Sequence, residues 1–278
     1  MKYKLVAIDM DGTLLNSDNK ISNRNMEILH KAVDKGIYIV LSTGRILESA
    51  LYYAKSIGLK NPIVACNGAI VSCEDGKDII YEKYMNIETS KKVMEIAEES
   101  NIYYHFYDRN TFYTKDIGEE LYKFYKSYED YEDKFKKQQI NLRLLDDPME
   151  FLKDEKPNIY KFVFIEDDED KLLNFRRKLG EIENINISSS WYNNVEVMNE
   201  GVSKGNALKH LSKVLNIDKS EIVAIGDNEN DISMFKIAGL AVAMKNGDEI
   251  IKKHSHVITD TNDENGVGNA IAKYVLNI

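Results

Sequence analysis

Short apolar runs recur at both ends of this chain, and each run is ended by a polar cluster and followed by a helical pattern. The runs cover residues 5–8, 37–41, 63–65, 222–225, 240–243 and 257–258. Runs of this length are typical of buried strands in a parallel sheet. Because strands alternate with helices, the connections are expected to be right-handed crossovers. The pattern therefore predicts an α/β fold with a Rossmann-like, doubly wound parallel sheet.

Two helices are predicted between the first three runs. The first begins after Ser22, which suits an N-cap, and ends at Gly36. The second covers residues 45–57 and ends at Gly58. The apolar face of the first helix is expected to consist of Met26, Leu29 and Val33.

The middle of the chain, residues 82–199, has a different character. It is rich in Tyr, Lys, Glu and Asp, and it lacks the alternation of strands and motifs seen at the two ends. We therefore predict an inserted α+β domain here, with residues 1–81 and 200–278 forming the core. Within the insertion, helices are expected at 88–100, 118–131 and 167–179, and strands at 103–106 and 160–165.

Composition and charge exclude several classes of partner. The 278 residues carry a formal net charge of -9, whereas a nucleic-acid-binding protein needs clustered Lys and Arg on a basic surface. No stretch approaches the roughly 18 consecutive apolar residues of a membrane helix, and the first residues lack the pattern of a signal peptide. We therefore expect no nucleic-acid partner, no membrane span, a cytoplasmic location, and reduced thiols at Cys66 and Cys73.

Two aspartates follow the first apolar run directly, in the sequence Asp9-Met10-Asp11-Gly12-Thr13. In an open parallel sheet, ligands bind beyond the carboxyl ends of the strands. Residues two apart in an extended segment can direct their side chains toward the same side, and Gly12 lets the backbone bend toward a ligand. The alternative is an ordinary turn, because Asp and Gly are common turn residues. The position after a strand favours a functional site.

Two further clusters begin predicted helices. Ser42-Thr43-Gly44-Arg45 follows the second run, where a hydroxyl and free backbone amides can bind an anion. Ser203-Lys204-Gly205 begins a helix that carries Leu208, Leu211 and Leu215. Each cluster also has an ordinary interpretation, because Ser and Thr are common N-caps and a lysine at a helix start is usually a solvated surface charge.

The fourth cluster, Gly226-Asp227-Asn228-Glu229-Asn230-Asp231, follows the run at 222–225. It places three carboxylates and two amides within six positions. Such a density of oxygen donors suits a hard cation, which takes oxygen ligands. Asn230 or Asp231 could instead cap the following helix, but that interpretation does not account for the whole cluster.

Together these motifs resemble the haloacid dehalogenase superfamily, in its Cof-type sugar-phosphatase branch. The resemblance covers both ends of the chain closely and the middle only by position and size. One departure is Lys245-Asn246-Gly247, where the branch usually has an Asn-Ala pair, and it alters no catalytic position. Flanking segments that also look similar are Cys66-Asn67-Gly68-Ala69, Glu196-Val197, Val242-Ala243-Met244 and Asn265-Gly266-Val267.

The resemblance implies a Mg²⁺-dependent phosphatase of small phosphorylated metabolites, such as sugar phosphates, flavin mononucleotide or pyridoxal phosphate. It assigns Asp9 as the nucleophile that carries an aspartyl-phosphate, and Asp11 as the acid and base. The metal would be held by the side chains of Asp9 and Asp227 and by the backbone carbonyl of Asp11. The insertion would be a cap that closes over the site and excludes water.

The remaining site residues follow from the same resemblance. Thr43 and Lys204 join the two aspartates as catalytic residues, and Asp231 is expected to orient Lys204 or to cap a helix. A phosphomutase of the same superfamily and a non-catalytic phosphosugar-binding regulator remain as alternatives. A two-component receiver also clusters acids around Mg²⁺ but is much shorter. A monomer or a weak homo-oligomer is expected. Phosphate binding is assigned to Asp9, Thr43, Gly44, Lys204 and Asn230.

Overall fold

The computed structural model describes residues 2–116 and 136–278, which form two compact units. The first unit contains Met1–Arg45, Tyr53–Glu82 and Ser203–Ile278, and the second contains Ile46–Tyr52 and Lys83–Val202. The second unit is thus largely one continuous segment placed between two parts of the first. The helix predicted at 118–131 lies outside the described residues.

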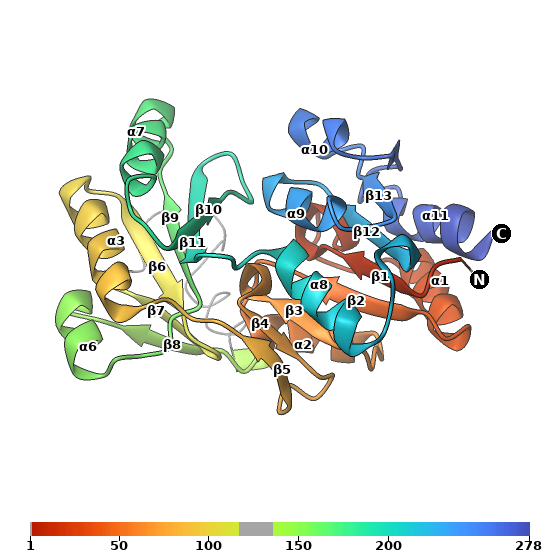
Figure 1. The fold of residues 1–278 in the computed structure, drawn as a ribbon, viewed down its shortest axis with the longest axis horizontal. Helices are drawn as coiled ribbons and strands as arrows, with labels where there is room; N and C mark the ends of the chain where they lie inside the picture. The colour runs from red at the N-terminus through yellow and green to blue at the C-terminus, as the bar shows by residue number, and fades with distance from the viewer. Residues whose placement is uncertain (1, 117–135) are drawn as a thin grey trace. The chain divides into compact units, whose positions relative to one another are not determined.

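The first unit is built on a mostly parallel sheet, which confirms the predicted fold class (Figure 1). β1 pairs in parallel with both β2 and β12, with Leu5 opposite Tyr38 on one side and Ile222 on the other. Strands β1 and β12 are fully buried, as expected for strands covered on both faces. In the part of the chain that is described, the strand order is β14 (Val257–Ile258), β13 (Leu240–Ala243), β12 (Ile222–Gly226), β1 (Leu5–Ile8), β2 (Tyr38–Ser42), β3 (Ile63–Ala65), β4 (Ile70–Ser72), β5 (Ile79–Glu82).

The last two strands of this sheet depart from the predicted parallel pattern. β4 pairs antiparallel with β3, and β5 pairs antiparallel with β4. The reversal occurs at the tight turn Cys66–Gly68, where Asn67 has a φ of 55° and Gly68 a φ of 93°. Because both residues adopt left-handed conformations, the chain folds straight back as a hairpin and no crossover helix is needed.

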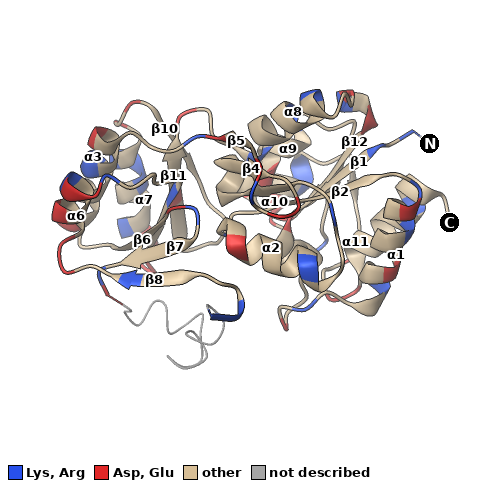
Figure 2. Cartoon of the chain, turned by 90° about the horizontal axis from the view of Figure 1, so that it is seen from below, with Lys and Arg blue, Asp and Glu red and all other residues tan. Residues whose placement is uncertain are grey.

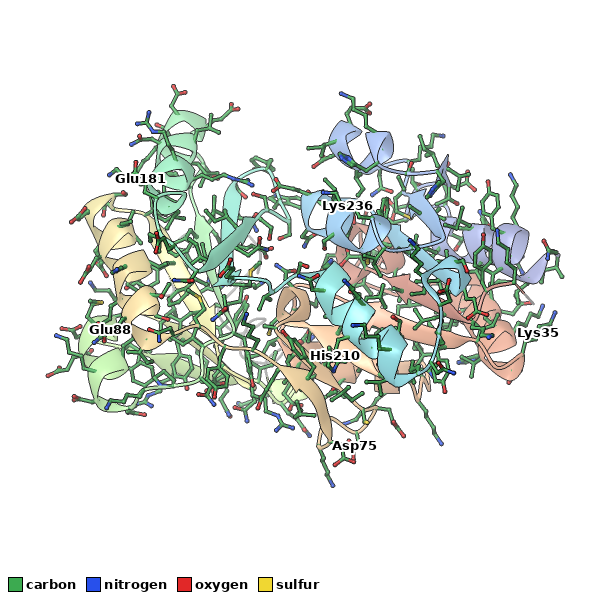
Figure 3. The ribbon with its side chains drawn as sticks, viewed as in Figure 1. Lys35, Asp75, Glu88, Glu181, His210 and Lys236 are labelled. Atoms are coloured by element: carbon green, nitrogen blue, oxygen red, sulfur yellow. The ribbon has the colours of Figure 1, made fainter. Side chains whose placement is uncertain are left out.

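The helices of the first unit begin and end close to the predicted positions. Ser22 caps α1 by accepting a hydrogen bond from the Asn25 amide at 3.1 Å, and Gly36 follows the helix with a φ of 78°. His210 on α8 packs against Tyr81 of β5, with ring centroids 5.0 Å apart (Figure 3). The helices described here are α1 (Asn23–Asp34), α8 (Lys204–Val214), α9 (Ile232–Phe235), α10 (Glu249–Lys253) and α11 (Gly266–Ala270), together with α2 (Leu47–Ser56), of which residues 47–52 are assigned to the second unit.

The predicted apolar face of α1 is only partly buried. Leu29 is buried as expected, but Met26 and Val33 are only partly buried. The helix packs against α11, and the Gly268 amide donates to Asn25 Oδ1 at 2.8 Å. Asn25 is therefore part of the buried face of α1. A polar side chain can be buried when its hydrogen bonds are satisfied, although hydrophobicity alone predicts that it is exposed.

The second unit is an α+β domain with a largely antiparallel sheet. Predicted strands at 103–106 and 160–165 correspond to β6 and β9, and predicted helices at 88–100 and 167–179 correspond to α3 and α7. Phe106, Phe162 and Phe164 lie in the hydrophobic core of this unit together with Phe175 of α7. Among the described residues its strand order is β10 (Ile185–Ser188), β11 (Asn194–Asn199), β9 (Lys161–Ile165), β6 (Tyr103–Tyr107), β7 (Thr111–Thr114), β8 (Asn141–Leu144), and its helices are α3 (Ile87–Glu99), α6 (Pro148–Asp154) and α7 (Glu169–Leu179).

Charges of both signs are mixed on the surface helices. On α1, Arg24 and Lys31 both contact Glu27, and on α3 Lys91 contacts Glu88. Figure 2 shows Lys and Arg interspersed with Asp and Glu on these helices. Exposed pairs of this kind contribute little to stability, and they describe a solvated helix face.

Candidate active site

Asp9 and Lys204 meet at the carboxyl end of β1. Asp9 directly follows the strand, and its amide donates to the Ile225 carbonyl at 3.0 Å, so the backbone is held in the sheet pattern up to this residue. Lys204 is the first residue of α8, which Ser203 caps by accepting the Asn206 amide. The buried Lys204 Nζ lies 2.6 Å from Asp9 Oδ1. The structure thus places the predicted lysine in contact with the predicted nucleophile.

Asp227 and Asp231 complete this buried group from the end of β12. Asp227 Oδ1 accepts a hydrogen bond from the Thr13 hydroxyl at 2.7 Å. Asp231 Oδ1 lies 2.7 Å from Lys204 Nζ, and its Oδ2 accepts the backbone amides of Asp227 at 2.9 Å and Asn228 at 3.2 Å. One Asp231 oxygen therefore holds the lysine, as one of the two predicted roles requires, and the other accepts the amides of the turn at Asp227 and Asn228; the Asp231 side chain does not cap α9, which begins after it.

The donor set of this group fits a hard divalent cation. Among the described residues, Asp9, Asp227 and Asp231 each offer a carboxylate oxygen within 4.8 Å of the others. Both oxygens of Asp231 already accept hydrogen bonds. Asp9 and Asp227 are therefore the better ligands, and all-oxygen ligation is what Mg²⁺ prefers.

The loop after Asp9 is built to lie against Asp227. Gly12 has a φ of 71°, and a Cβ atom at this position would come 2.4 Å from Asp227 Oδ2. Only glycine fits both the left-handed backbone and this close approach. Gly12 is therefore held next to the Asp227 carboxylate.

The buried carboxylates of Asp9, Asp227 and Asp231 carry more negative charge than the single cation of Lys204 compensates. Burial raises the pKa of Asp9 from 3.8 to about 7, against the lowering effect of Lys204, and the carboxylates of Asp231 and Asp11 raise it further. Burial, followed by the charges of Asp9 and Asp231, holds the pKa of Asp227 well above its ordinary value. A bound cation would relieve this repulsion, because an opposite charge favours the ionised form of a buried carboxyl.

The Lys204 ammonium is stabilised by the same arrangement. Burial alone lowers the pKa of a lysine, but the charges of Asp231 and Asp9 outweigh this effect and raise the pKa of Lys204 above its ordinary value. Lys204 is therefore a permanent cation within the carboxylate group.

Asp11 does not join this buried group. Its carboxylate forms an ion pair with Arg45, in which Arg45 Nε donates to Asp11 Oδ2 at 2.7 Å and Nη2 donates to Oδ1. The side chain of Asp11 is 53% exposed. Sequence reasoning placed Asp11 correctly beside Asp9 but did not anticipate Arg45 as its partner.

Thr43, Gly44 and Asn230 lie on two loops that Asn67 connects. Thr43 is fully buried, and its amide donates to the Val64 carbonyl at 2.9 Å. The Asn67 amide donates to the Thr43 carbonyl at 2.9 Å, and Asn230 Nδ2 donates to Asn67 Oδ1 at 3.3 Å. Gly44 follows Thr43 in the loop ahead of α2. Asn67 was not predicted as a site residue, although an Asn-Gly pair directly after a strand favours left-handed backbone.

Asn246 is a second contributor that sequence reasoning missed. Its Nδ2 donates to the Gly12 carbonyl at 2.8 Å, and its Oδ1 accepts the Asn262 amide at 3.0 Å. Asn262 Nδ2 in turn donates to the Leu15 carbonyl at 2.9 Å. The loop that follows Asp9 is therefore tied at two carbonyls to the segments that follow β13 and β14. Asn246 lies in the segment where the sequence departs from the Cof-type pattern.

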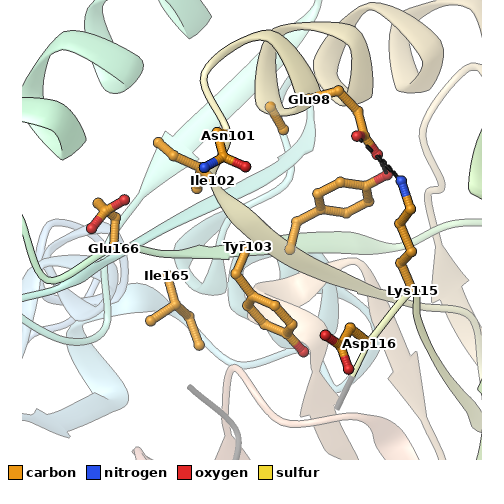
Figure 4. A pocket seen from close by; sticks show the side chains of 10 residues that line it. Glu98, Asn101, Ile102, Tyr103, Lys115, Asp116, Ile165 and Glu166 are labelled. Atoms are coloured by element: carbon orange, nitrogen blue, oxygen red, sulfur yellow. Dashed lines mark hydrogen bonds and ion pairs between the residues drawn. The ribbon is translucent and has the colours of Figure 1, made fainter. Parts of the chain in front are cut away.

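A pocket of about 400 Å³ in the second unit contains none of the predicted site residues (Figure 4). Glu98 on its wall accepts the Tyr104 hydroxyl at 2.9 Å and contacts Lys115 at 3.4 Å. The polar groups of Glu98, Tyr104 and Lys115 therefore bond to one another, and we assign no function to this pocket.

Comparisons with known proteins show the family of this chain. A family model described as haloacid dehalogenase-like hydrolase matches residues 6–271. The chain is 32% identical to the phosphatase YwpJ of Bacillus subtilis (strain 168), over 95% of this chain and 97% of that protein. It is also 32% identical to the 5-amino-6-(5-phospho-D-ribitylamino)uracil phosphatase YcsE of the same organism, over 98% of this chain and 96% of that protein. A solved haloacid dehalogenase-like hydrolase from B. subtilis is 30% identical, with a TM-score of 0.87 over 98% of this chain and 99% of that chain.

The chain therefore belongs to the haloacid dehalogenase-like hydrolases, as the motifs predicted. It is an enzyme of the phosphoric monoester hydrolase class. In the described residues, no helix combines the length and the apolar character that crossing a bilayer requires.

Proposed function

We propose that this enzyme is a Mg²⁺-dependent phosphatase of small phosphorylated metabolites that works through an aspartyl-phosphate on Asp9. The observation that carries the proposal is the buried contact of 2.6 Å between Lys204 Nζ and Asp9 Oδ1, with Asp227 beside them. Residues 1–81 and 200–278 would form the catalytic core and 82–199 the inserted cap.

The metal site would use the side chains of Asp9 and Asp227 and the backbone carbonyl of Asp11. Mg²⁺ bound there supplies positive charge that offsets the repulsion between the Asp9 carboxylate and a phosphate dianion. Lys204 adds a second positive charge at the nucleophile. The Thr43 hydroxyl, the Gly44 amide and the Asn230 side chain would hold the phosphoryl oxygens, since phosphoryl transfer depends mainly on positioning and electrostatics.

Two displacements at phosphorus make up the reaction. First, an Asp9 oxygen bonds to phosphorus while the bond to the leaving oxygen breaks, and that oxygen takes a proton from Asp11. Second, water bonds to phosphorus while the bond to Asp9 breaks, and Asp11 accepts the proton of the water. The products are the free alcohol and inorganic phosphate, and both aspartates return to their starting states.

The substrate class is taken to be a phosphorylated sugar, polyol or cofactor. Three of the B. subtilis relatives, YcsE, YwtE and YitU, are named as 5-amino-6-(5-phospho-D-ribitylamino)uracil phosphatases. That compound is a phosphorylated polyol, so it belongs in the substrate panel. The other members are glucose 6-phosphate, flavin mononucleotide, pyridoxal phosphate and p-nitrophenyl phosphate.

The test is release of inorganic phosphate from this panel with Mg²⁺ present. Asp9→Asn is expected to abolish turnover while its circular dichroism spectrum stays that of the wild type. Asp34→Asn, at the exposed end of α1, is the matched control and should keep full activity. Turnover close to wild type in Asp9→Asn would refute the nucleophile assignment. Conversion of a sugar phosphate to an isomer with little phosphate release would favour the phosphomutase instead.

A further inference from the structure

The ion pair between Asp11 and Arg45 joins two motifs that lie 34 positions apart in the chain. Two guanidinium nitrogens of Arg45 donate to the two different oxygens of Asp11. A two-point contact between a planar guanidinium and a planar carboxylate fixes the orientation of the carboxylate as well as its position. Asp11 is therefore held in a defined direction beside the buried carboxylates.

Arg45 is the anchored member of this pair. Its amide donates to Thr43 Oγ1 at 3.1 Å, and its carbonyl accepts the Cys66 amide at 2.9 Å. Its guanidinium carbon lies 5.1 Å from the centre of the Tyr53 ring, a cation–π contact. The Arg45 side chain is 17% exposed, compared with 53% for Asp11. The arginine is thus fixed by its surroundings, and the aspartate takes its orientation from the arginine.

We propose that Arg45 is a positioning residue for Asp11, so that the Asp11 carboxyl group reaches the leaving oxygen of the phosphate ester. The inference rests on the proposed function, in which protonated Asp11 gives its proton to that oxygen as the bond to phosphorus breaks, and is left as the carboxylate that pairs with Arg45. Arg45 itself takes no part in the proton transfer and acts only through Asp11.

This role predicts a dependence on the leaving group. An alkyl phosphate departs as an unstable alkoxide unless it is protonated, whereas p-nitrophenolate is a stable anion at neutral pH. General acid assistance contributes about 10²–10⁴-fold to rates. Loss of the orientation of Asp11 should therefore slow alkyl esters strongly and p-nitrophenyl phosphate weakly.

The experiment compares Arg45→Ala, Asp11→Asn and the double variant. The substrates are p-nitrophenyl phosphate and the alkyl phosphate of the panel with the highest turnover, both at saturating Mg²⁺. We expect Arg45→Ala to lower kcat/KM, which reports the steps up to departure of the leaving group, by about tenfold more for the alkyl ester than for the aryl ester, a part of the general acid effect. In the Asp11→Asn background, Arg45→Ala should cause no further loss, because both changes remove the same function. Arg45→Lys keeps the positive charge but cannot donate two hydrogen bonds in the geometry of a guanidinium, so it should be only partly as active as the wild type.

Two results would overturn the inference. One is an equal loss of kcat/KM on both esters in Arg45→Ala, and the other is an additional loss of kcat/KM in the double variant, since either would mean that Arg45 does not act through the acid role of Asp11. Arg24→Ala removes an arginine of the same unit that pairs with Glu27 at 3.4 Å, and it should leave both rates unchanged. Urea midpoints of all variants separate a folding defect from a positioning defect.

The same set of variants separates this inference from the proposed function. If Asp11→Asn alone lowers kcat/KM of both esters equally, the acid role of Asp11 fails before Arg45 is considered. If Asp11→Asn discriminates between the esters and Arg45→Ala does not, only the positioning role of Arg45 fails.

Discussion

Removing the charge of Asp9 should make the metal-free enzyme more stable, although it abolishes catalysis. Burial raises the pKa of Asp9 from 3.8 to about 7. Because the folded protein holds this proton more tightly than the unfolded chain, Asp9 lowers the stability as the pH rises from 3.8 toward 7, and the penalty is constant above that value. The uncharged amide of the Asp9→Asn variant would carry no such penalty.

The size of the effect follows from the two pKa values. Each tenfold change in an acid dissociation constant corresponds to about 1.4 kcal/mol, so the full penalty is roughly 4 kcal/mol at pH 8 and less than half of that at pH 5. The stability difference between Asp9→Asn and wild type should therefore widen by about 2–3 kcal/mol between pH 5 and pH 8.

The assay is urea unfolding of both proteins in EDTA at the two pH values, with Asp34→Asn as the reference for charge removal at an exposed site. With Mg²⁺ present the difference at pH 8 should narrow, because ion binding stabilises only the protein that retains its ligand, by about 2.7 kcal/mol at 100 times the dissociation constant and about 4.1 kcal/mol at 1,000 times, where the gain offsets the penalty. A stability difference that does not change with pH, or an Asp9→Asn variant less stable than wild type at pH 8 in EDTA, would refute the reasoning.

Three further changes probe the neighbours of Asp9. Lys204→Met leaves the buried carboxylates of Asp9 and Asp231 without their cation, so we expect a loss of about 3–5 kcal/mol in unfolding free energy and of turnover, measured by urea unfolding and phosphate release. Asn246→Ala removes the donor to the Gly12 carbonyl, a hydrogen bond worth about 1 kcal/mol, and should raise the Mg²⁺ concentration for half-maximal activity about fivefold, with Asn269→Ala as an unaffected control. Gly12→Ala places a Cβ atom 2.4 Å from Asp227 Oδ2 at a φ of 71°, and it should weaken Mg²⁺ binding to the resting enzyme in calorimetric titrations by at least tenfold; unchanged binding would contradict the close approach.

The four motifs show how much of the site can be predicted from the sequence. Each motif directly follows an apolar run or begins a helix, and the carboxyl ends of parallel strands meet at one edge of a sheet. Asp9, Lys204 and Asp227 could therefore be assigned to one site although Asp9 and Lys204 are 195 positions apart. The strands at 5–8 and 63–65 and the α1 cap at Ser22 were correct because apolar periodicity and capping are local properties.

The errors and omissions concern partners that local pattern does not specify. The hairpin of β3 and β4 depends on left-handed backbone at Asn67 and Gly68, and the buried face of α1 depends on the packing of Asn25 against α11. Neither can be read from hydrophobicity, because the first results from the backbone conformation of a short turn and the second from a contact with a distant segment.

The sequence by itself determined the class of fold, the edge of the sheet that carries the site, and the residue types available for the chemistry. Only the tertiary structure decided which polar groups pair: Asp231 with both Lys204 and the Asp227 amide, Asp11 with Arg45, and Asn246 with the Gly12 carbonyl. The reason is physical. Periodicity and strand order place backbone segments, whereas a hydrogen bond or ion pair requires atoms to lie within about 3 Å in the correct direction, and that distance exists only after the separate segments have packed together.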